Sequence, residues 1–209
     1  YFLIGTSSSD FYNPADDTFT AGPNPPETTT IDSFYIPSGI NSGKYLILTT
    51  TASTFIYDPV AELFSSGPSL PGVLHSSTRN FLIPSGTYAG YICVIRGRDY
   101  SDTYLYDPAA GSFITGPSLP GLMGAGLRTF NITSGPQSGN IMVIRSNETD
   151  NTYIYECSSS TFISGPAMTI TSGNTIRGGF NFETSTGRLI SPAGFGTGST
   201  IYDYATNTF

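Results

Sequence analysis

The chain is poor in the residues on which most metal and catalytic sites depend. Its 209 residues include one histidine, two cysteines and no tryptophan, and charged residues make up 11%. A zinc site built from several histidine and cysteine ligands therefore lacks its ligands, and we expect no metal and no cofactor. The net charge of -7 argues against nucleic acid or anionic membrane as the main partner. No apolar run approaches about 18 residues, so we expect no membrane-inserted segment.

The two cysteines and the polar composition bear on the compartment. Cys93 falls in an apolar run and Cys157 in a turn. A disulfide between them stays open, because it requires Cα atoms within about 7 Å. Lysine is scarce while serine and threonine are abundant. This composition favours an extracellular or cell-surface protein.

The chain contains one sequence motif repeated five times: a tyrosine, then a turn, then a phenylalanine seven positions after the tyrosine. The tyrosines recur at intervals of 45, 49, 49 and 47 residues. The five pairs are Tyr12 and Phe19, Tyr57 and Phe64, Tyr106 and Phe113, Tyr155 and Phe162, and Tyr202 and Phe209. Such a period predicts one supersecondary unit copied along a single domain.

Each repeat contains four strand-like runs, which we call A to D in chain order. Run B is almost continuously apolar, as at 45–48, 91–95 and 141–144, and predicts a strand covered on both faces. The tyrosine ends run C, and Asp58 and Asp107 after it suit a turn in which the carboxylate caps backbone amides. The phenylalanine lies in run D and is expected to pack between neighbouring sheets. Four strands in about 47 residues is typical of a propeller blade.

With these motifs the chain resembles the kelch-type β-propellers of the galactose-oxidase-like class. The matching features are apolar run B, the Tyr-Asp-Pro motif at 57–59 and 106–108, and the Gly-Pro-x-Leu-Pro segments that follow run D at 67–71 and 116–120. The resemblance implies an all-β propeller of four-stranded blades in a single domain, 1–209, with blades at about 1–26, 30–71, 78–120, 127–168 and 176–209. The chain departs from the family by lacking its double glycine after strand B, and by having phenylalanine where strand D usually carries tryptophan.

The first repeat begins at run B, so the first blade is expected to lack its inner strand. An unpaired sheet edge is an aggregation liability. Three sources could fill the edge: further residues after Phe209 that close a five-bladed ring, whole additional blades, or a strand from a neighbouring subunit. The third source predicts self-association through the open blade edge.

Six of the eight basic residues fall in the B-to-C and D-to-A connections, which emerge on one side of a propeller. Just before run A stand Arg79, Arg128 and Arg177. Run B ends with Arg96 and Arg145 in two of the repeats, and Arg98 follows Arg96 in the same loop. Asp32 holds the matching place one repeat before Arg79. Guanidinium groups bind carboxylate and sulfate, so these arginines are the candidate ligand-binding residues. The alternative is that each arginine ties its own blade to the next by pairing with loop carbonyls or with acids such as Asp99, Asp102 or Asp150.

Signatures of an enzyme are missing from the sequence, and we expect no catalytic residues. The resemblance implies that a copper-radical oxidase needs two histidine ligands, whereas the chain has only His75. Neither a sialidase Asp-box nor a serine nucleophile elbow is present. A noncatalytic extracellular binding or scaffolding propeller, with a protein or glycan partner, is the leading interpretation. The rivals are the propeller portion of a carbohydrate-active enzyme or oxidase, and a structural subunit of a surface assembly.

Asn147 forms a weak glycosylation sequon with Thr149, and Asn131 a second that we interpret as a chance match.

Overall fold

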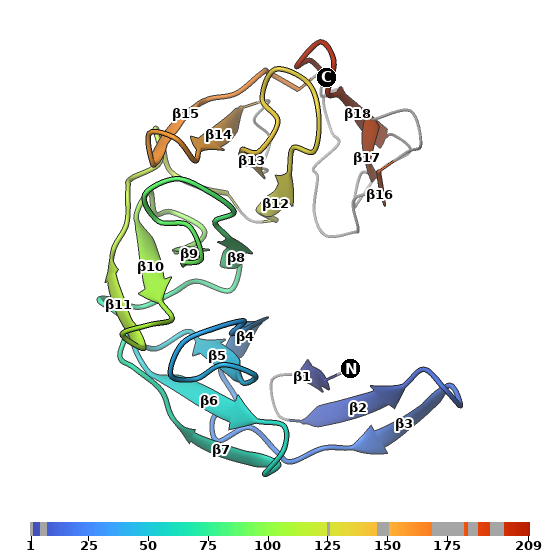
Figure 1. The fold of residues 1–209 in the computed structure, drawn as a ribbon, viewed down its shortest axis with the longest axis vertical. Coiled ribbons are helices and arrows are strands. Elements are labelled where there is room, and N and C mark those ends of the chain that lie inside the picture. Colours follow the sequence, from blue (N-terminus) through green and yellow to red (C-terminus); the bar gives the residue numbers. More distant parts are fainter. Residues whose placement is uncertain are drawn as a thin grey trace.

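The computed structural model describes residues 2–4, 8–124, 126–145, 151–168, 182–183, 188–192 and 199–209, and these residues form strands and turns without a helix. The described residues therefore contain no helix that could cross a bilayer. The strands form five antiparallel sheets, which we number 1 to 5 in chain order. Figure 1 shows the sheets following one another along an open arc. The fold is therefore all-β and consistent with a β-propeller.

The strands of each sheet follow one another in sequence. Sheet 1 holds β1 (Phe2–Ile4), β2 (Ser9–Asn13) and β3 (Thr18–Ala21). Sheet 2 holds β4 (Thr30–Tyr35), β5 (Tyr45–Thr49), β6 (Thr54–Asp58) and β7 (Leu63–Ser66). Sheet 3 holds β8 (Arg79–Leu82), β9 (Ile92–Ile95), β10 (Thr103–Asp107) and β11 (Ser112–Thr115). Sheet 4 holds β12 (Arg128–Asn131), β13 (Ile141–Ile144), β14 (Thr152–Glu156) and β15 (Thr161–Ser164). Sheet 5 holds β16 (Phe182–Glu183), β17 (Arg188–Pro192) and β18 (Ser199–Asp203).

The first strands of sheets 2, 3 and 4, namely β4, β8 and β12, lie on the inner side of the arc (Figure 1). In sheet 1 the order is β1-β2-β3, so that β1 stands where β5, β9 and β13 stand in the four-stranded sheets. At the other end, the expected last strand around Phe209 is present only as an isolated bridge between Asp203 and Thr208.

The second strand of each four-stranded sheet is buried on both faces, which confirms the expectation from its apolar run. Its side chains alternate between the two neighbouring interfaces. In sheet 3, Ile92 and Val94 pack with residues of sheet 2, while Cys93 and Ile95 pack with residues of sheet 4. All four are at most 2% exposed. The hydrophobic core is thus divided into slabs between consecutive sheets, and each slab belongs to two repeats.

An aromatic contact recurs in each slab. A phenylalanine of the inner strand lies against the tyrosine of the next sheet, with ring centroids 5.5 to 5.9 Å apart. The pairs are Phe34 with Tyr106, Phe81 with Tyr155, and Phe130 with Tyr202. Between sheets 1 and 2, Phe11 lies 6.3 Å from Tyr57 instead. Since Phe11 belongs to β2, it makes this contact from a different strand than the others do.

The expected packing of the run D phenylalanine between sheets is confirmed for Phe113, Phe162 and Phe209. Each run D phenylalanine also contacts the tyrosine of its own repeat, as Phe162 does with Tyr155 at 5.0 Å between ring centroids. Phe162 and Phe113 also border the slab shared with the preceding sheet. Phe19 in sheet 1 is 62% exposed. The expectation of packing between sheets is therefore wrong for Phe19, because no preceding sheet covers it among the described residues.

A second contact between sheets recurs on one side of the arc, where the turn after the inner strand approaches the turn of the next sheet. A Cβ added to Gly39, Gly86 or Gly135 would collide with the carbonyl oxygen of Pro108, Cys157 or Tyr204, respectively. All three glycines have positive φ, between +77° and +85°. A side chain at these positions would therefore clash with the next sheet as well as strain its own turn.

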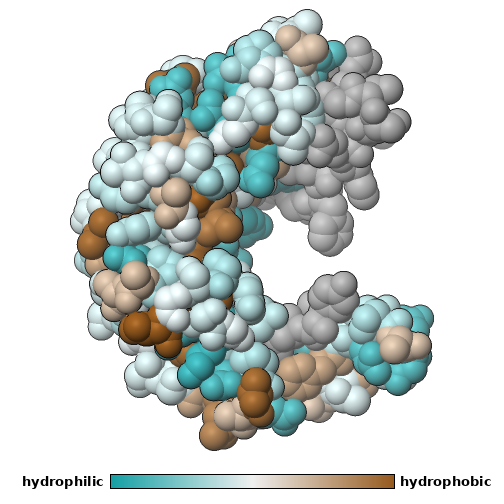
Figure 2. Space-filling model, in the orientation of Figure 1, coloured by the Kyte–Doolittle hydropathy of each residue, from teal (hydrophilic) through white to brown (hydrophobic). Residues whose placement is uncertain are grey.

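Most of the face visible in Figure 2 is hydrophilic or neutral, with hydrophobic residues scattered in small groups. The most exposed large apolar residues, Val60, Ile40 and Leu63, belong to turns or to an outer strand. Isolated residues of this kind are normal on a protein surface.

Candidate functional site

The candidate site is a row of three charged residues on adjacent inner strands. Arg79 begins β8 and Arg128 begins β12, and both pair with the last residue of the neighbouring strand, Ile95 or Ile144. Asp32 occupies the equivalent place on β4, two residues before the inner-strand phenylalanine. Because β4, β8 and β12 lie side by side along the inner side of the arc (Figure 1), the row runs across three sheets.

Side chains next to the row tie the three inner strands together. The Asn80 amide Nδ2 donates to Asp32 Oδ2 at 2.9 Å and to the carbonyl oxygen of Ser33 at 3.3 Å. One sheet further, Thr129 Oγ1 donates to the carbonyl oxygen of Asn80 at 3.3 Å. These bonds link residues 47 to 49 positions apart in the sequence. The Asn80 bonds hold Asp32 against β8, the strand that Arg79 begins.

The electrostatics of the row reflect burial and proximity. Desolvation raises the pKa of the Asp32 carboxyl, opposed by the amide of Ser33 and by the Arg79 charge, among other groups. Burial lowers the pKa of the Arg128 guanidinium, and the nearby charge of Arg79 lowers it further. Arg79 therefore acts on both neighbours, an acid on one side and a second base on the other. The row has the charge sequence negative, positive, positive.

The three residues differ in their access to solvent. Arg128 is only 5% exposed, whereas Asp32 and Arg79 are half-buried. Arg79 Nη1 donates to the carbonyl oxygen of Thr78 at 2.7 Å. A solute reaching this place would meet Arg79 and Asp32 directly, while Arg128 contributes its charge from a buried position.

Two of the other predicted arginines, Arg96 and Arg98, pair with an acid close by in the chain. Arg96 is held in place by three partners, the Asp102 carboxylate at 3.0 Å, the Val73 carbonyl at 2.6 Å, and the Tyr100 ring, whose centroid lies 3.6 Å from Cζ. Arg98 pairs with Asp99 at 3.3 Å on an exposed loop. Both arginines thus pair with acids that the alternative role names, Asp102 and Asp99.

The remaining two arginines and the two sequon asparagines are placed as follows. Arg145 directly follows the second strand of sheet 4, and its backbone amide donates to the Asn151 carbonyl at 3.4 Å. Arg177 and Asn147 lie outside the described residues. Asn131, the other sequon asparagine, ends inner strand β12 and is exposed.

The histidine and the cysteines are placed as follows. His75 Nδ1 lies 3.3 Å from Ser76 Oγ and 3.4 Å from Ser77 Oγ, in the loop before β8. Cys93 and Cys157 both lie in the slab between sheets 3 and 4 as buried free thiols, so the disulfide left open by the sequence is not formed. Burial raises the pKa of both thiols. Among the described residues no cluster of three or more histidine, cysteine or acidic side chains could hold a metal ion.

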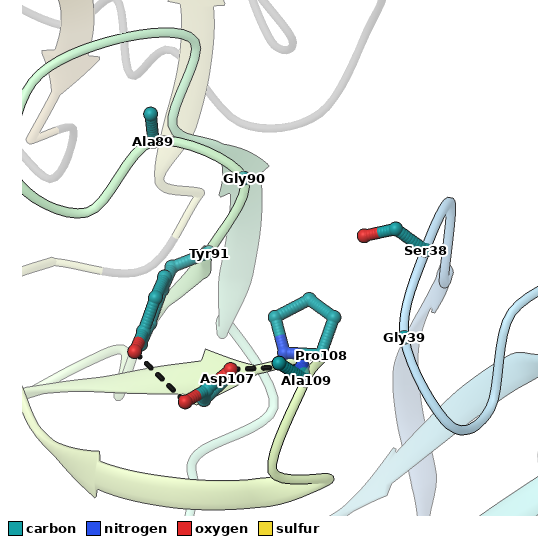
Figure 3. A pocket seen from close by; sticks show the side chains of 8 residues that line it. All are labelled: Ser38, Gly39, Ala89, Gly90, Tyr91, Asp107, Pro108 and Ala109. Atoms are coloured by element: carbon teal, nitrogen blue, oxygen red, sulfur yellow. Dashed lines mark hydrogen bonds between the residues drawn. The ribbon is translucent and has the colours of Figure 1, made fainter.

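A small open pocket of about 140 Å³ lies between sheets 2 and 3, on the side of the glycine turns. Figure 3 shows Ser38 and Gly39 of sheet 2 facing Tyr91, Asp107 and Pro108 of sheet 3. Tyr91 donates its hydroxyl hydrogen to Asp107 Oδ2 at 2.8 Å. Asp107 Oδ1 accepts the backbone amides of the two residues after Pro108, at 2.8 and 3.3 Å. The predicted capping role of Asp107 is thereby confirmed, and its carboxylate serves the turn.

Sequence reasoning missed one recurrent polar contact. Three residues before each of the first four repeat tyrosines stands a serine or threonine whose buried hydroxyl donates, at 2.7 Å, to the carbonyl oxygen of the proline that follows run D. The pairs are Ser9 with Pro23, Thr54 with Pro68, Thr103 with Pro117, and Thr152 with Pro166. The fixed offset from the tyrosine and from the Gly-Pro exit was the signal that could have revealed it.

Comparison with known proteins gives one informative result. No family model matches the chain, and no curated protein matches it. Among solved structures, 96% of the chain aligns with 25% of the crystallised extracellular domain of a proposed one-component system from B. thetaiotaomicron, at 10% identity and a TM-score of 0.54. At this identity the likeness concerns the fold alone. The chain spans a quarter of that chain's length.

Proposed function

We propose that this protein is a noncatalytic binding propeller of the kelch type, with five blades in the present chain. It presents the side of the arc that carries Arg79 to an acidic glycan or protein partner outside the cell. Low lysine with high serine and threonine content supports the location, and so does the similar solved structure, which is an extracellular domain.

The observation that carries the proposal is the half-buried Arg79 guanidinium, which stands at the start of β8 beside Arg128 of β12. The charge of Arg79 lowers the pKa of the Arg128 guanidinium, so an anion placed beside Arg79 would interact with both positive charges. The ion pairs formed among the described residues engage Lys44, Arg96 and Arg98 but not Arg79. Arg79 thus has a half-buried guanidinium available for a carboxylate or sulfate group.

The test is binding to polymers that differ in charge. Polygalacturonate, dextran sulfate and neutral dextran would be immobilised, and binding measured at 50 and 500 mM sodium chloride. We expect binding to an acidic polymer but not to dextran, weakened by salt. Loss of one charge-assisted hydrogen bond in Arg79→Gln should weaken it about tenfold. Lys44→Gln, which removes the same charge from the Lys44–Asp58 pair, is the matched control. Absence of binding, or equal effects of the two substitutions, would contradict the proposal.

A second candidate, a structural role in an assembly, is favoured by the two end faces of the arc. Phe19 on sheet 1 is 62% exposed, whereas Phe162 in the equivalent place is 8% exposed. At the other end, Ile201 is 44% exposed, whereas its equivalents in sheets 2, 3 and 4 (Ile56, Leu105 and Ile154) are at most 4% exposed. Each end therefore shows apolar surface that a neighbouring sheet covers elsewhere in the chain.

This role predicts concentration-dependent self-association, which sedimentation velocity would measure. Phe19→Ser and Ile201→Ser should each reduce it, because each removes one apolar end. A sedimentation coefficient that stays constant for the unmodified protein across a hundredfold range of concentration would exclude self-association through these ends.

A further inference from the structure

We infer that the row of Asp32, Arg79 and Arg128 selects a sugar acid, in which a carboxylate stands beside hydroxyl groups, over a densely sulfated polymer. This inference deepens the proposed function and rests on it. It concerns the residue that the proposed function leaves unused, the carboxylate of Asp32.

Asp32 is held where it can take part in binding. Its Oδ2 accepts the Asn80 amide at 2.9 Å, and its Oδ1 accepts the amide of Ser33 at 2.9 Å. An ionised carboxylate has about four lone-pair positions, so about two stay free for a ligand. Strands β4 and β8 are in contact, and the Arg79 charge acts on this carboxyl, so the acceptor lies within electrostatic reach of the Arg79 guanidinium.

Each residue of the row would then contact a different part of a sugar acid. The guanidinium of half-buried Arg79 donates to the ligand carboxylate, and buried Arg128 strengthens the local positive potential. Half-buried Asp32 accepts a hydrogen bond from a hydroxyl group on the carbon chain next to that carboxylate. A sugar acid offers this combination of one anion and neighbouring donors on a rigid ring.

The same carboxylate works against polysulfates. A polymer with sulfate groups at successive positions would place a second negative charge near Asp32 once the first has reached Arg79. Like charges brought together in a partly desolvated place repel strongly enough to reduce affinity. A site built only to bind negative charge would have a neutral or basic residue here, as sheets 3 and 4 have at the equivalent place. Specificity therefore comes from one attractive and one repulsive element.

The experiment is calorimetric titration of the full chain with trigalacturonic acid, its methyl ester and a sulfated trisaccharide of similar size. The variants are Arg79→Gln, Asp32→Asn and Lys44→Gln. Asp32→Asn keeps the shape and one oxygen acceptor but removes the charge. Circular dichroism and the melting temperature of each variant would show that the fold is retained.

We expect Arg79→Gln to weaken both anionic probes, which is the mark of the proposed function. We expect Asp32→Asn to have opposite effects, weakening trigalacturonic acid about three- to tenfold and strengthening the sulfated probe by a similar factor. If Asp32→Asn strengthens both probes or changes neither, the selection of sugar acids is overturned while anion binding stands. If Arg79→Gln behaves as Lys44→Gln does, or no probe binds, the proposed function and the inference fail together.

Discussion

The glycine turns offer a sharp test of how consecutive sheets are joined, because each turn carries a matched pair of glycines. Gly86 and Gly90 both have φ of +85°. A Cβ at Gly86 would run into the carbonyl of Cys157 in the next sheet, whereas a Cβ at Gly90 would meet no atom within 4 Å. Alanine at either site imposes the same left-handed backbone strain. Only alanine at Gly86 also pushes two sheets apart.

The magnitudes follow from this difference. Left-handed backbone costs an alanine about 1–2 kcal/mol, part of which is offset by the lower entropy of the unfolded chain. Gly90→Ala should therefore lower the free energy of unfolding by about 1 kcal/mol. Gly86→Ala adds a clash against backbone that cannot turn away, of the kind that costs about 1–3 kcal/mol more. The difference between the two variants isolates the contact between sheets 3 and 4.

The assay is urea unfolding followed by tyrosine fluorescence, since the chain has no tryptophan, with far-ultraviolet circular dichroism as a second probe. Agreement of the two probes would show that a single transition is being measured. Gly39 and Gly43 form an equivalent pair one sheet earlier and should give the same order. Equal destabilisation by Gly86→Ala and Gly90→Ala would refute the proposition that these turns fix the spacing of the sheets.

Three other substitutions test the contacts that recur along the chain. Thr103→Val removes the buried hydroxyl that donates to the Pro117 carbonyl, and should cost about 1–3 kcal/mol in urea unfolding, because the carbonyl is left without its partner. The Tyr91 hydroxyl and the turn amides lower the pKa of Asp107, so this carboxylate stabilises the fold above its unfolded pKa of about 4, and the contribution disappears as pH falls through the lower folded pKa. Asp107→Asn should therefore lower the urea midpoint at pH 7 and change it less at pH 3, and equal changes at both pH values would contradict this. Phe81→Ala empties a place in the slab between sheets 3 and 4 and should cost about 3–5 kcal/mol, measured by calorimetry, and a loss below about 1 kcal/mol would show that the slab is loosely packed.

The strands could be predicted from the sequence because their signals are local. The run Tyr91 to Ile95 is short, apolar throughout and rich in β-branched residues, which together indicate a strand buried on both faces. Asp107 accepts the backbone amides of residues two and three positions later, so its capping role involves only residues that are neighbours in the sequence. Features of this kind need no knowledge of which sheet comes next.

The role of each arginine could not be predicted in the same way. Arg79 and Arg96 both belong to series of arginines spaced by 49 residues. Arg96 nevertheless pairs with Asp102, six positions on, whereas Arg79 lies between Asp32 of sheet 2 and Arg128 of sheet 4. The sequence placed Asp32 in register with Arg79 but gave no sign of the Asn80 bond that holds it there. Phe19 illustrates the same limit, since its exposure depends on whether another sheet precedes it.

The candidate site is therefore a property of the contacts between sheets rather than of any single repeat. Its residues come from β4, β8 and β12, and their separation depends on the slabs and turns that set the distance from one sheet to the next. Asn80 belongs to both systems, because its bonds join sheets 2 and 3 and also orient the Asp32 carboxylate. A change that loosens the stacking of the sheets would thus move an acid relative to two bases. Under the proposed function, such a movement would change which anions bind to this row of mixed charge, even when no residue of the row is replaced.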